Sequence, residues 1–180
     1  MRVLVAYASR HGATQGIAQR IATTLQAAGI DADLRAAGTV NRVAEYDAFV
    51  IGSAAYMFHW LKDAVSLVQR NRAALVGKPV WLFSSGPLGT DPLDAKGRDQ
   101  KESAIPKEIP DLREAVGARA HRVFFGVYAR DRKPIGIAER FVSHMPAARE
   151  GLPEGGFRDW PEIEAWAAEI ARDLLSVPAH

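Results

Sequence analysis

Six consecutive residues near the N-terminus have the types and spacing of an anion-binding turn. They are Ser9, Arg10, His11, Gly12, Ala13 and Thr14. The two hydroxyl groups add hydrogen-bond donors without crowding an anion, and Gly12 lets the backbone approach it closely. Residues 3–7 before the turn are apolar and strand-favouring, and Ile17, Ile21 and Leu25 after it lie on one face of a helix. Because the first N–H groups of a helix are unpaired and partly positive, this arrangement predicts a phosphate site.

A second explanation of this turn stays open. Hydroxyl residues commonly cap helices, so Ser9 or Thr14 could satisfy helix N–H groups with no ligand present. The glycine and the position directly after the first strand favour phosphate over a plain cap. His11 either adds charge to the phosphate or is a solvated loop histidine.

Two further segments are expected at the same edge of the molecule. Residues 52–60 carry Tyr56, Phe58 and Trp60 on alternate positions, and residues 84–89 read Ser-Ser-Gly-Pro-Leu-Gly. Each segment follows a predicted strand. In an open parallel sheet, ligands bind beyond the carboxyl ends of the strands, where the strand order reverses. A phosphate turn, an aromatic loop and a glycine loop at one edge predict, as the ligand, a flat aromatic ring on a phosphorylated arm.

The predicted ligand contacts in these two loops are Ser53, Ala54, Ala55, Tyr56, Trp60, Ser85, Gly86 and Gly89. The aromatic rings could instead pack on their own domain or on a second subunit, and a Gly-Pro turn alone would explain the composition of residues 84–89. His59 is either an acid or base near the ligand or an exposed loop histidine. No catalytic side chain and no metal ligand is assigned, since the acidic residues of the long loop lack EF-hand spacing.

The rest of the chain predicts the elements that position these loops. Strand patterns occur at residues 3–7, 30–36, 47–52, 80–84 and 123–128, and helix patterns occur at 17–28, 60–75, 110–117, 137–145 and 159–175. Alternating strands and helices predict a parallel sheet with helices on both faces. Residues 87–117 read as a long loop with a short helix, and residues 130–158 as an extra helix with its connection. With no linker and no repeat, residues 1–180 are expected to form one domain.

Composition restricts the class of protein. The 180 residues are 48% hydrophobic and 24% charged and contain no cysteine, which excludes thiolate nucleophiles, Cys-ligated zinc and iron–sulfur clusters. The net charge of +2 and the pI of about 9.0 are too small to predict nucleic-acid binding. The N-terminus lacks a signal-peptide pattern, and no stretch approaches the roughly 18 apolar residues of a membrane span. A cytoplasmic protein is therefore expected.

These motifs resemble the flavodoxin-like family. Residues 9–14 fit its FMN-phosphate pattern of a hydroxyl, two variable residues, glycine, any residue and a hydroxyl. Within the family the chain is most similar to the menaquinone-dependent protoporphyrinogen oxidase branch and related bacterial flavodoxin-domain proteins, through residues 7–14, 51–54, 137–145 and 159–163. The resemblance implies an α/β fold: a flavodoxin-like three-layer α/β/α sandwich, with a five-stranded parallel sheet of order 2-1-3-4-5 and an extra helix before the last helix. It also implies FMN as the cofactor.

The resemblance implies an FMN-dependent oxidoreductase that passes electrons to or from a planar apolar substrate, such as a quinone or a porphyrinogen. A non-enzymatic flavodoxin-type electron carrier and a flavodoxin-fold binding protein without FMN stay open as alternatives, as does a deazaflavin in place of FMN. Electron-carrier flavodoxins resemble one another in being strongly acidic, and this chain is not. The expected partners are a small-molecule redox substrate or a redox partner protein, with peripheral membrane association and a homodimer as further expectations and no nucleic acid.

Overall fold

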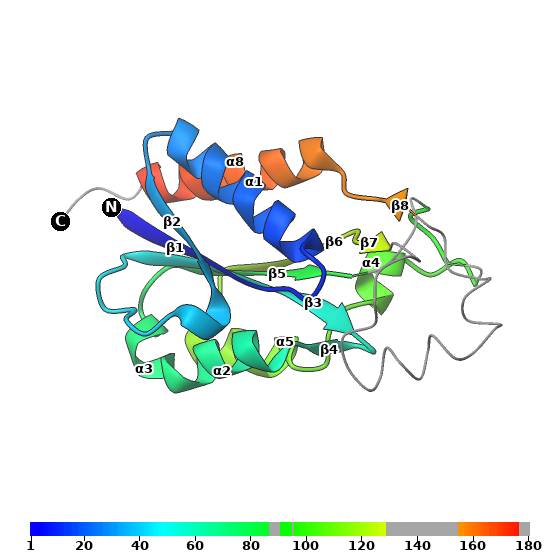
Figure 1. Ribbon diagram of the computed structural model, residues 1–180, viewed down its shortest axis with the longest axis horizontal. Coiled ribbons are helices and arrows are strands. Elements are labelled where there is room, and N and C mark those ends of the chain that lie inside the picture. Colours follow the sequence, from blue (N-terminus) through cyan, green and yellow to red (C-terminus); the bar gives the residue numbers. More distant parts are fainter. Residues whose placement is uncertain (87–90, 95, 129–154, 177–180) are drawn as a thin grey trace.

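The computed structural model describes residues 1–86, 91–94, 96–128 and 155–176. Its centre is a parallel sheet in the order β2-β1-β3-β5-β6 (Figure 1). These strands are β1 (Arg2–Ala8), β2 (Asp31–Ala36), β3 (Ala48–Tyr56), β5 (Val80–Ser85) and β6 (Ala120–Phe124). A short strand, β4 (His59–Trp60), turns back antiparallel on the end of β3. With β4 set aside, the order is the predicted 2-1-3-4-5, and the predicted fold class is confirmed.

Helices cover both faces of the sheet, which gives the three layers seen in Figure 1. One face carries α1 (Ala13–Ala27) and α8 (Trp160–Ser176), and the other carries α2 (Lys62–Arg70), α3 (Arg72–Leu75) and α5 (Ile109–Val116). The shorter elements are η1 (Ala37–Thr39), α4 (Gln100–Ser103) and the paired strands β7 (Val127–Tyr128) and β8 (Gly155–Gly156).

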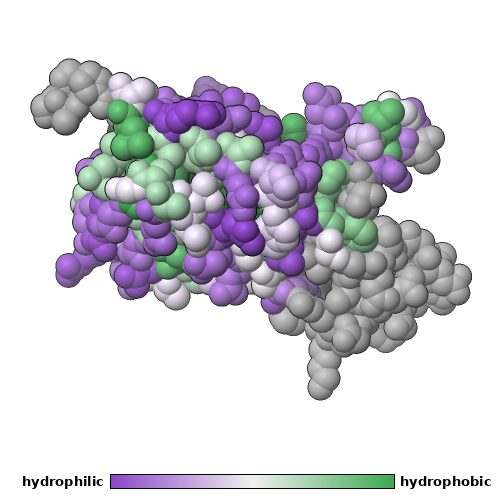
Figure 2. Space-filling model, turned by 90° about the horizontal axis from the view of Figure 1, so that it is seen from above, coloured by the Kyte–Doolittle hydropathy of each residue, from purple (hydrophilic) through white to green (hydrophobic). Residues whose placement is uncertain are grey.

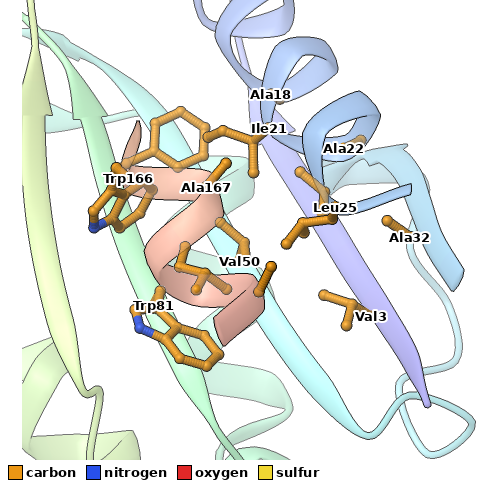
Figure 3. Packing of buried hydrophobic residues seen from close by; sticks show 14 of the residues in the cluster. Val3, Ala18, Ile21, Ala22, Leu25, Ala32, Val50, Trp81, Trp166 and Ala167 are labelled. Atoms are coloured by element: carbon orange, nitrogen blue, oxygen red, sulfur yellow. The ribbon is translucent and has the colours of Figure 1, made fainter. Parts of the chain in front are cut away.

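Side chains along the strands alternate between two hydrophobic clusters. Val3 and Val5 of β1 belong to the cluster under α1 and α8, whereas Leu4 and Ala6 belong to the cluster under α2 and α5. All four are fully buried, as expected for a parallel strand covered on both faces. Figure 3 shows side chains of α1, α8 and the sheet meeting in the first cluster. Hydrophilic residues cover much of the outer surface above these two helices (Figure 2).

Gly52 in β3 is required by packing. A Cβ atom at this position would lie 2.1 to 2.4 Å from atoms of the Phe83 ring on β5. That ring fills the space over Gly52 and meets Phe124 and Trp166 at centroid distances of 6.2 and 6.3 Å. The strand was expected to end at Gly52, but it continues four residues further, to Tyr56.

The fifth parallel strand differs from its prediction. It occupies residues 120–124 rather than 123–128. Its first half contains His121 and Arg122, and because these side chains are polar, the segment lacks the apolar pattern of a buried strand. β6 lies at the edge of the sheet, where polar residues are tolerated. Residues 127–128 form the separate short strand β7.

The helices agree with their predictions except at their ends. The helix expected at 60–75 begins at Lys62, after β4, and is interrupted at Asn71. The predicted cap of the last helix is confirmed, because Asp159 Oδ1 accepts the Glu162 N–H at 2.9 Å. The short helix α4 was not predicted, and the helix expected at 137–145 lies outside the described residues.

Candidate functional site

The predicted phosphate turn joins β1 to α1. Gly12 is the N-cap residue of α1 and has a left-handed backbone with φ of 81°, a conformation that favours glycine. The Gly12 N–H donates to Ser9 Oγ at 3.0 Å, and its carbonyl accepts the Gly16 N–H at 3.0 Å. Ser9 therefore shapes the turn as a hydrogen-bond acceptor and keeps its hydroxyl hydrogen for a further acceptor.

Thr14 is the most informative residue of the turn. Its side chain is fully buried in the first turn of α1, and its Oγ1 has no hydrogen-bond partner among the described residues. A buried hydroxyl without a partner costs about 1–3 kcal/mol. Such a donor beside the positive end of a helix fits an oxygen of an anionic ligand. The donor set of the turn thus fits a phosphate group.

The aromatic segment forms a β-hairpin rather than a loop. β3 and β4 are joined by Met57 and Phe58, which have φ angles of 49° and 63°. Two successive left-handed residues make the tight turn that suits a two-residue hairpin, where Asn-Gly is usual. For Met and Phe this backbone costs on the order of 1–3 kcal/mol each. Both side chains are nevertheless exposed, at 70% and 54%. Strain and exposed apolar surface therefore coincide at the tip of this hairpin.

On its outer side the hairpin is held by the segment that precedes α5. Glu108 Oε1 lies 2.6 Å from His59 Nδ1, and Glu108 Oε2 accepts the Trp60 N–H at 3.2 Å. The Lys107 N–H also donates to the Phe58 carbonyl at 2.9 Å. Burial by itself would raise the pKa of Glu108, but the hydrogen bonds from His59 and the Trp60 backbone outweigh it and lower the pKa. This clamp was missed in the sequence, because it joins residues far apart in the chain.

On its inner side the hairpin is anchored by three polar side chains in a row. Trp60 is only 5% exposed, and its Nε1–H donates to Ser84 Oγ at 2.8 Å. Ser84 Oγ lies 2.8 Å from His121 Nε2. Because indole nitrogen only donates, Ser84 accepts from Trp60 and its own hydroxyl donates to His121 Nε2. Neutral His121 then carries its proton on Nδ1. Burial, with the positive charge of Arg113, lowers the pKa of His121 to about 4.

The structure brings the described parts of the three predicted segments, residues 9–14, 52–60 and 84–86, to one edge of the sheet. In the strand register Ala8 pairs with Ser53, and Ala54 pairs with Ser85, so the ends of β1, β3 and β5 are neighbours. The Arg10 guanidinium also lies over the Tyr56 ring, 4.9 Å from its centroid, and so links the turn to the hairpin. The predicted convergence of the three segments is therefore present.

Some predicted contact residues are engaged in the fold itself. The buried Ser53 Oγ accepts the Leu61 N–H at 2.9 Å and donates to the Ala54 carbonyl at 2.9 Å. The Trp60 ring belongs to the cluster under α2 and α5, so it supports the hairpin from within. Their contacts with a ligand stay predictions.

The glycine loop is described only at its start. Ser85 is 6% exposed at the end of β5, and the Gly86 N–H donates to the Phe124 carbonyl at 2.9 Å. A Cβ atom at Gly86 would lie 3.5 Å from Val123 and 3.8 Å from Ala104, so this backbone is close to α4. Gly89 lies outside the described residues.

Within residues 1–86, 91–94, 96–128 and 155–176, no group of three or more His, Cys, Asp or Glu residues is arranged to hold a metal ion. In the same part of the chain, no helix is long and apolar enough to cross a membrane.

Comparison with known proteins gives one family and a consistent fold. A family model described as a flavodoxin domain matches residues 4–132, which is more than half of the chain. A flavodoxin from the domain Archaea is similar at 16% identity with a TM-score of 0.61, and the match covers 97% of this chain and 99% of that one. Flavodoxin 1 from Bacillus cereus is similar at 12% identity with a TM-score of 0.59, covering 99% and 100%.

A larger protein contains the same fold as a part. The rubredoxin:oxygen oxidoreductase from Desulfovibrio gigas is similar at 14% identity with a TM-score of 0.59, and the match covers 98% of this chain and 37% of that one. At these identities the likeness shows the fold alone. The search of curated proteins gave no significant match.

Proposed function

The chain belongs to the flavodoxin domain family, and from this membership we propose that it binds FMN at the carboxyl edge of its sheet and passes electrons through it. The observation that carries the proposal is the buried hydroxyl of Thr14 in the first turn of α1, which has no hydrogen-bond partner within the described part of the chain. A phosphate at this turn would satisfy that donor and would lie at the positive end of the helix.

Each part of the edge has a role in this proposal. The Ser9 and Thr14 hydroxyls and the first N–H groups of α1 bind the phosphate. The ends of β3 and β5, at residues 54–56 and 85–86, contact the flavin ring. Because Thr14 has no exposed surface, the turn must shift outward before a phosphate oxygen reaches its hydroxyl. When bound, FMN supplies the redox chemistry, and the protein supplies position and electrostatics.

The substrate class is part of the proposal. Met57 and Phe58 project apolar side chains into solvent at the rim of this edge. A flat apolar molecule, such as a quinone or a porphyrinogen, would bury them and come close to the cofactor. Burial of two such side chains would contribute on the order of 1.5–3 kcal/mol each, which offsets the strain of their turn.

An electron carrier that docks on other proteins is the second candidate function. It is favoured by the likeness to flavodoxins over almost the whole chain. The balance of charge, +2 with a pI of about 9.0, favours the enzyme instead, because acidic carriers use their charge to steer to basic partners. Turnover with a quinone and a nicotinamide donor would favour the enzyme, whereas electron exchange only with redox proteins would favour the carrier.

The experiment that tests cofactor binding is a visible absorption spectrum of the purified protein, repeated after incubation with FMN and desalting. We expect the bands of oxidised flavin to remain with the protein in a stoichiometric amount. Protein that stays colourless at micromolar FMN would contradict the proposal and would turn attention to a deazaflavin or to a binding role without cofactor.

A further inference from the structure

Arg158 reaches the first turn of α1 from the far end of the sequence. The segment before α8 is fixed beside the sheet, where the Phe157 N–H donates to the Gly126 carbonyl at 3.0 Å. From there the Arg158 guanidinium lies over the Trp160 ring, 4.5 Å from its centroid. Its Nη1 atom lies 2.6 Å from the place where a Cβ of Gly16 would be. Gly16 thus leaves the space that this guanidinium fills.

The position of this cation relative to the helix is defined. Gly16 is one turn beyond the N-cap Gly12, whose carbonyl accepts the Gly16 N–H. A Cβ on a helix points toward the N-terminus, so an atom at that place lies over the first turn, on a different face of α1 from the buried Thr14. A cation at this end of a helix opposes the helix macrodipole and is unfavourable there. The same charge becomes favourable once an anion binds there.

We propose that Arg158 supplies a fixed positive charge to the phosphate site and makes the site select FMN over the unphosphorylated flavin, riboflavin. The inference rests on the proposed function and adds a ligand-selecting residue outside the turn. Stacking on Trp160 and the gap at Gly16 hold the guanidinium in place, so little side-chain freedom is lost when the phosphate binds. A glycine in a helix is destabilising relative to alanine, and the space that Arg158 occupies explains why glycine stands at position 16.

A matched control lies on the same ring. The Arg20 guanidinium is also over Trp160, 4.8 Å from the centroid. It forms an ion pair with Glu164, and Arg20 lies one turn further along α1 than Gly16. Arg20→Gln therefore removes the same charge and a contact with the same ring, away from the start of the helix.

The test compares the dissociation constants of FMN and riboflavin for the wild type, Arg158→Gln, Gly16→Ala and Arg20→Gln by fluorescence titration. We expect Arg158→Gln to weaken FMN about 10-fold or more, as for a hydrogen bond to a charged group, and to leave riboflavin unchanged. Gly16→Ala should act in the same direction, because its methyl group displaces the guanidinium without removing its charge. Arg20→Gln should change neither ligand. The salt dependence of FMN binding should also flatten in Arg158→Gln.

Each other result overturns the inference. If Arg158→Gln weakens FMN and riboflavin equally, the residue only packs the site. If FMN binding is unchanged, Arg158 does not meet the phosphate. If the wild type binds neither flavin, the proposed function itself fails and the inference fails with it. If the wild type binds FMN and Arg158→Gln binds it with the same affinity, the inference about Arg158 fails but the proposed function stands.

Discussion

Replacing Thr14 by valine is expected to stabilise the empty protein and to weaken cofactor binding. Valine has the shape of threonine without the hydroxyl, and the Thr14 hydroxyl is fully buried with no partner among the described residues. Removing an unpaired buried hydroxyl should recover about 1–3 kcal/mol of unfolding free energy. For a chain of this size, each kcal/mol corresponds to about 2–4 °C in melting temperature.

The effect on FMN should have the opposite sign. A hydrogen bond to a charged group is worth about 1.5–3 kcal/mol, so Thr14→Val should weaken FMN binding by about 10- to 150-fold. The assay is thermal unfolding of the cofactor-free protein together with a fluorescence titration of FMN. A stability gain with an affinity loss is hard to explain by general damage to the fold.

Thr24 in the same helix provides the control. Its hydroxyl donates to the Arg20 carbonyl at 2.9 Å, so Thr24→Val removes a satisfied group. We expect no stability gain and no change in FMN affinity for this variant. If Thr14→Val destabilises the empty protein, or leaves the FMN dissociation constant unchanged, the reasoning about the turn is refuted.

Three further predictions concern the hairpin and its anchors. Ser84→Ala should lower the unfolding free energy measured in urea by about 1–3 kcal/mol, because it leaves the Trp60 Nε1–H and His121 Nε2 without a hydrogen-bond partner. An unchanged urea midpoint would show that the hydrogen bonds from Trp60 through Ser84 to His121 do not stabilise the fold. The pKa of His121 is lowered to about 4 from 6.5, so the unfolded chain binds this proton first as the pH falls. Neutral His121 therefore contributes about 3 kcal/mol to the unfolding free energy above pH 6.5, and this contribution disappears as the pH falls toward 4. In His121→Gln the unfolding free energy measured in urea should change less with pH over that range. The same pH dependence in the wild type and the variant would exclude this role of His121. Replacing Met57 and Phe58 together by Asn-Gly should raise the melting temperature, because it relieves backbone strain of about 1–3 kcal/mol per residue. The same change should slow the reaction with an apolar electron acceptor. A lower melting temperature would show that the turn is not strained.

Local signals in the sequence were sufficient for the fold and for the shape of the turn before α1, and phosphate binding at that turn stays a prediction. Gly12 at the start of α1, the buried apolar strands β1, β3 and β5 and the Asp159 cap depend on signals within a few residues, and each lies within a few residues of its predicted place. The fifth parallel strand, β6, begins three residues before its prediction. The register of a parallel sheet then brings the ends of β1, β3 and β5 together without further information.

The parts that were missed depend on contacts between distant segments. The turn of the hairpin consists of Met57 and Phe58, whereas an Asn-Gly pair would have predicted it from the sequence. Glu108 and Lys107, which bond to the hairpin, come from another part of the chain. The bond between Ser84 and His121 joins two neighbouring strands, and nothing next to either residue in the sequence indicates it. Arg158 and Gly16 likewise lie side by side only in the folded protein.

FMN is proposed to lie at the edge formed by the turn, the hairpin and the end of β5. The most direct measurement is a set of ¹H–¹⁵N spectra of the protein recorded while FMN is added. We expect the largest shifts at the amides of residues 9–14, 54–56 and 85–86, and much smaller shifts at residues 9–14 when riboflavin is added instead. Shifts centred elsewhere, or equal shifts of residues 9–14 with both flavins, would contradict it.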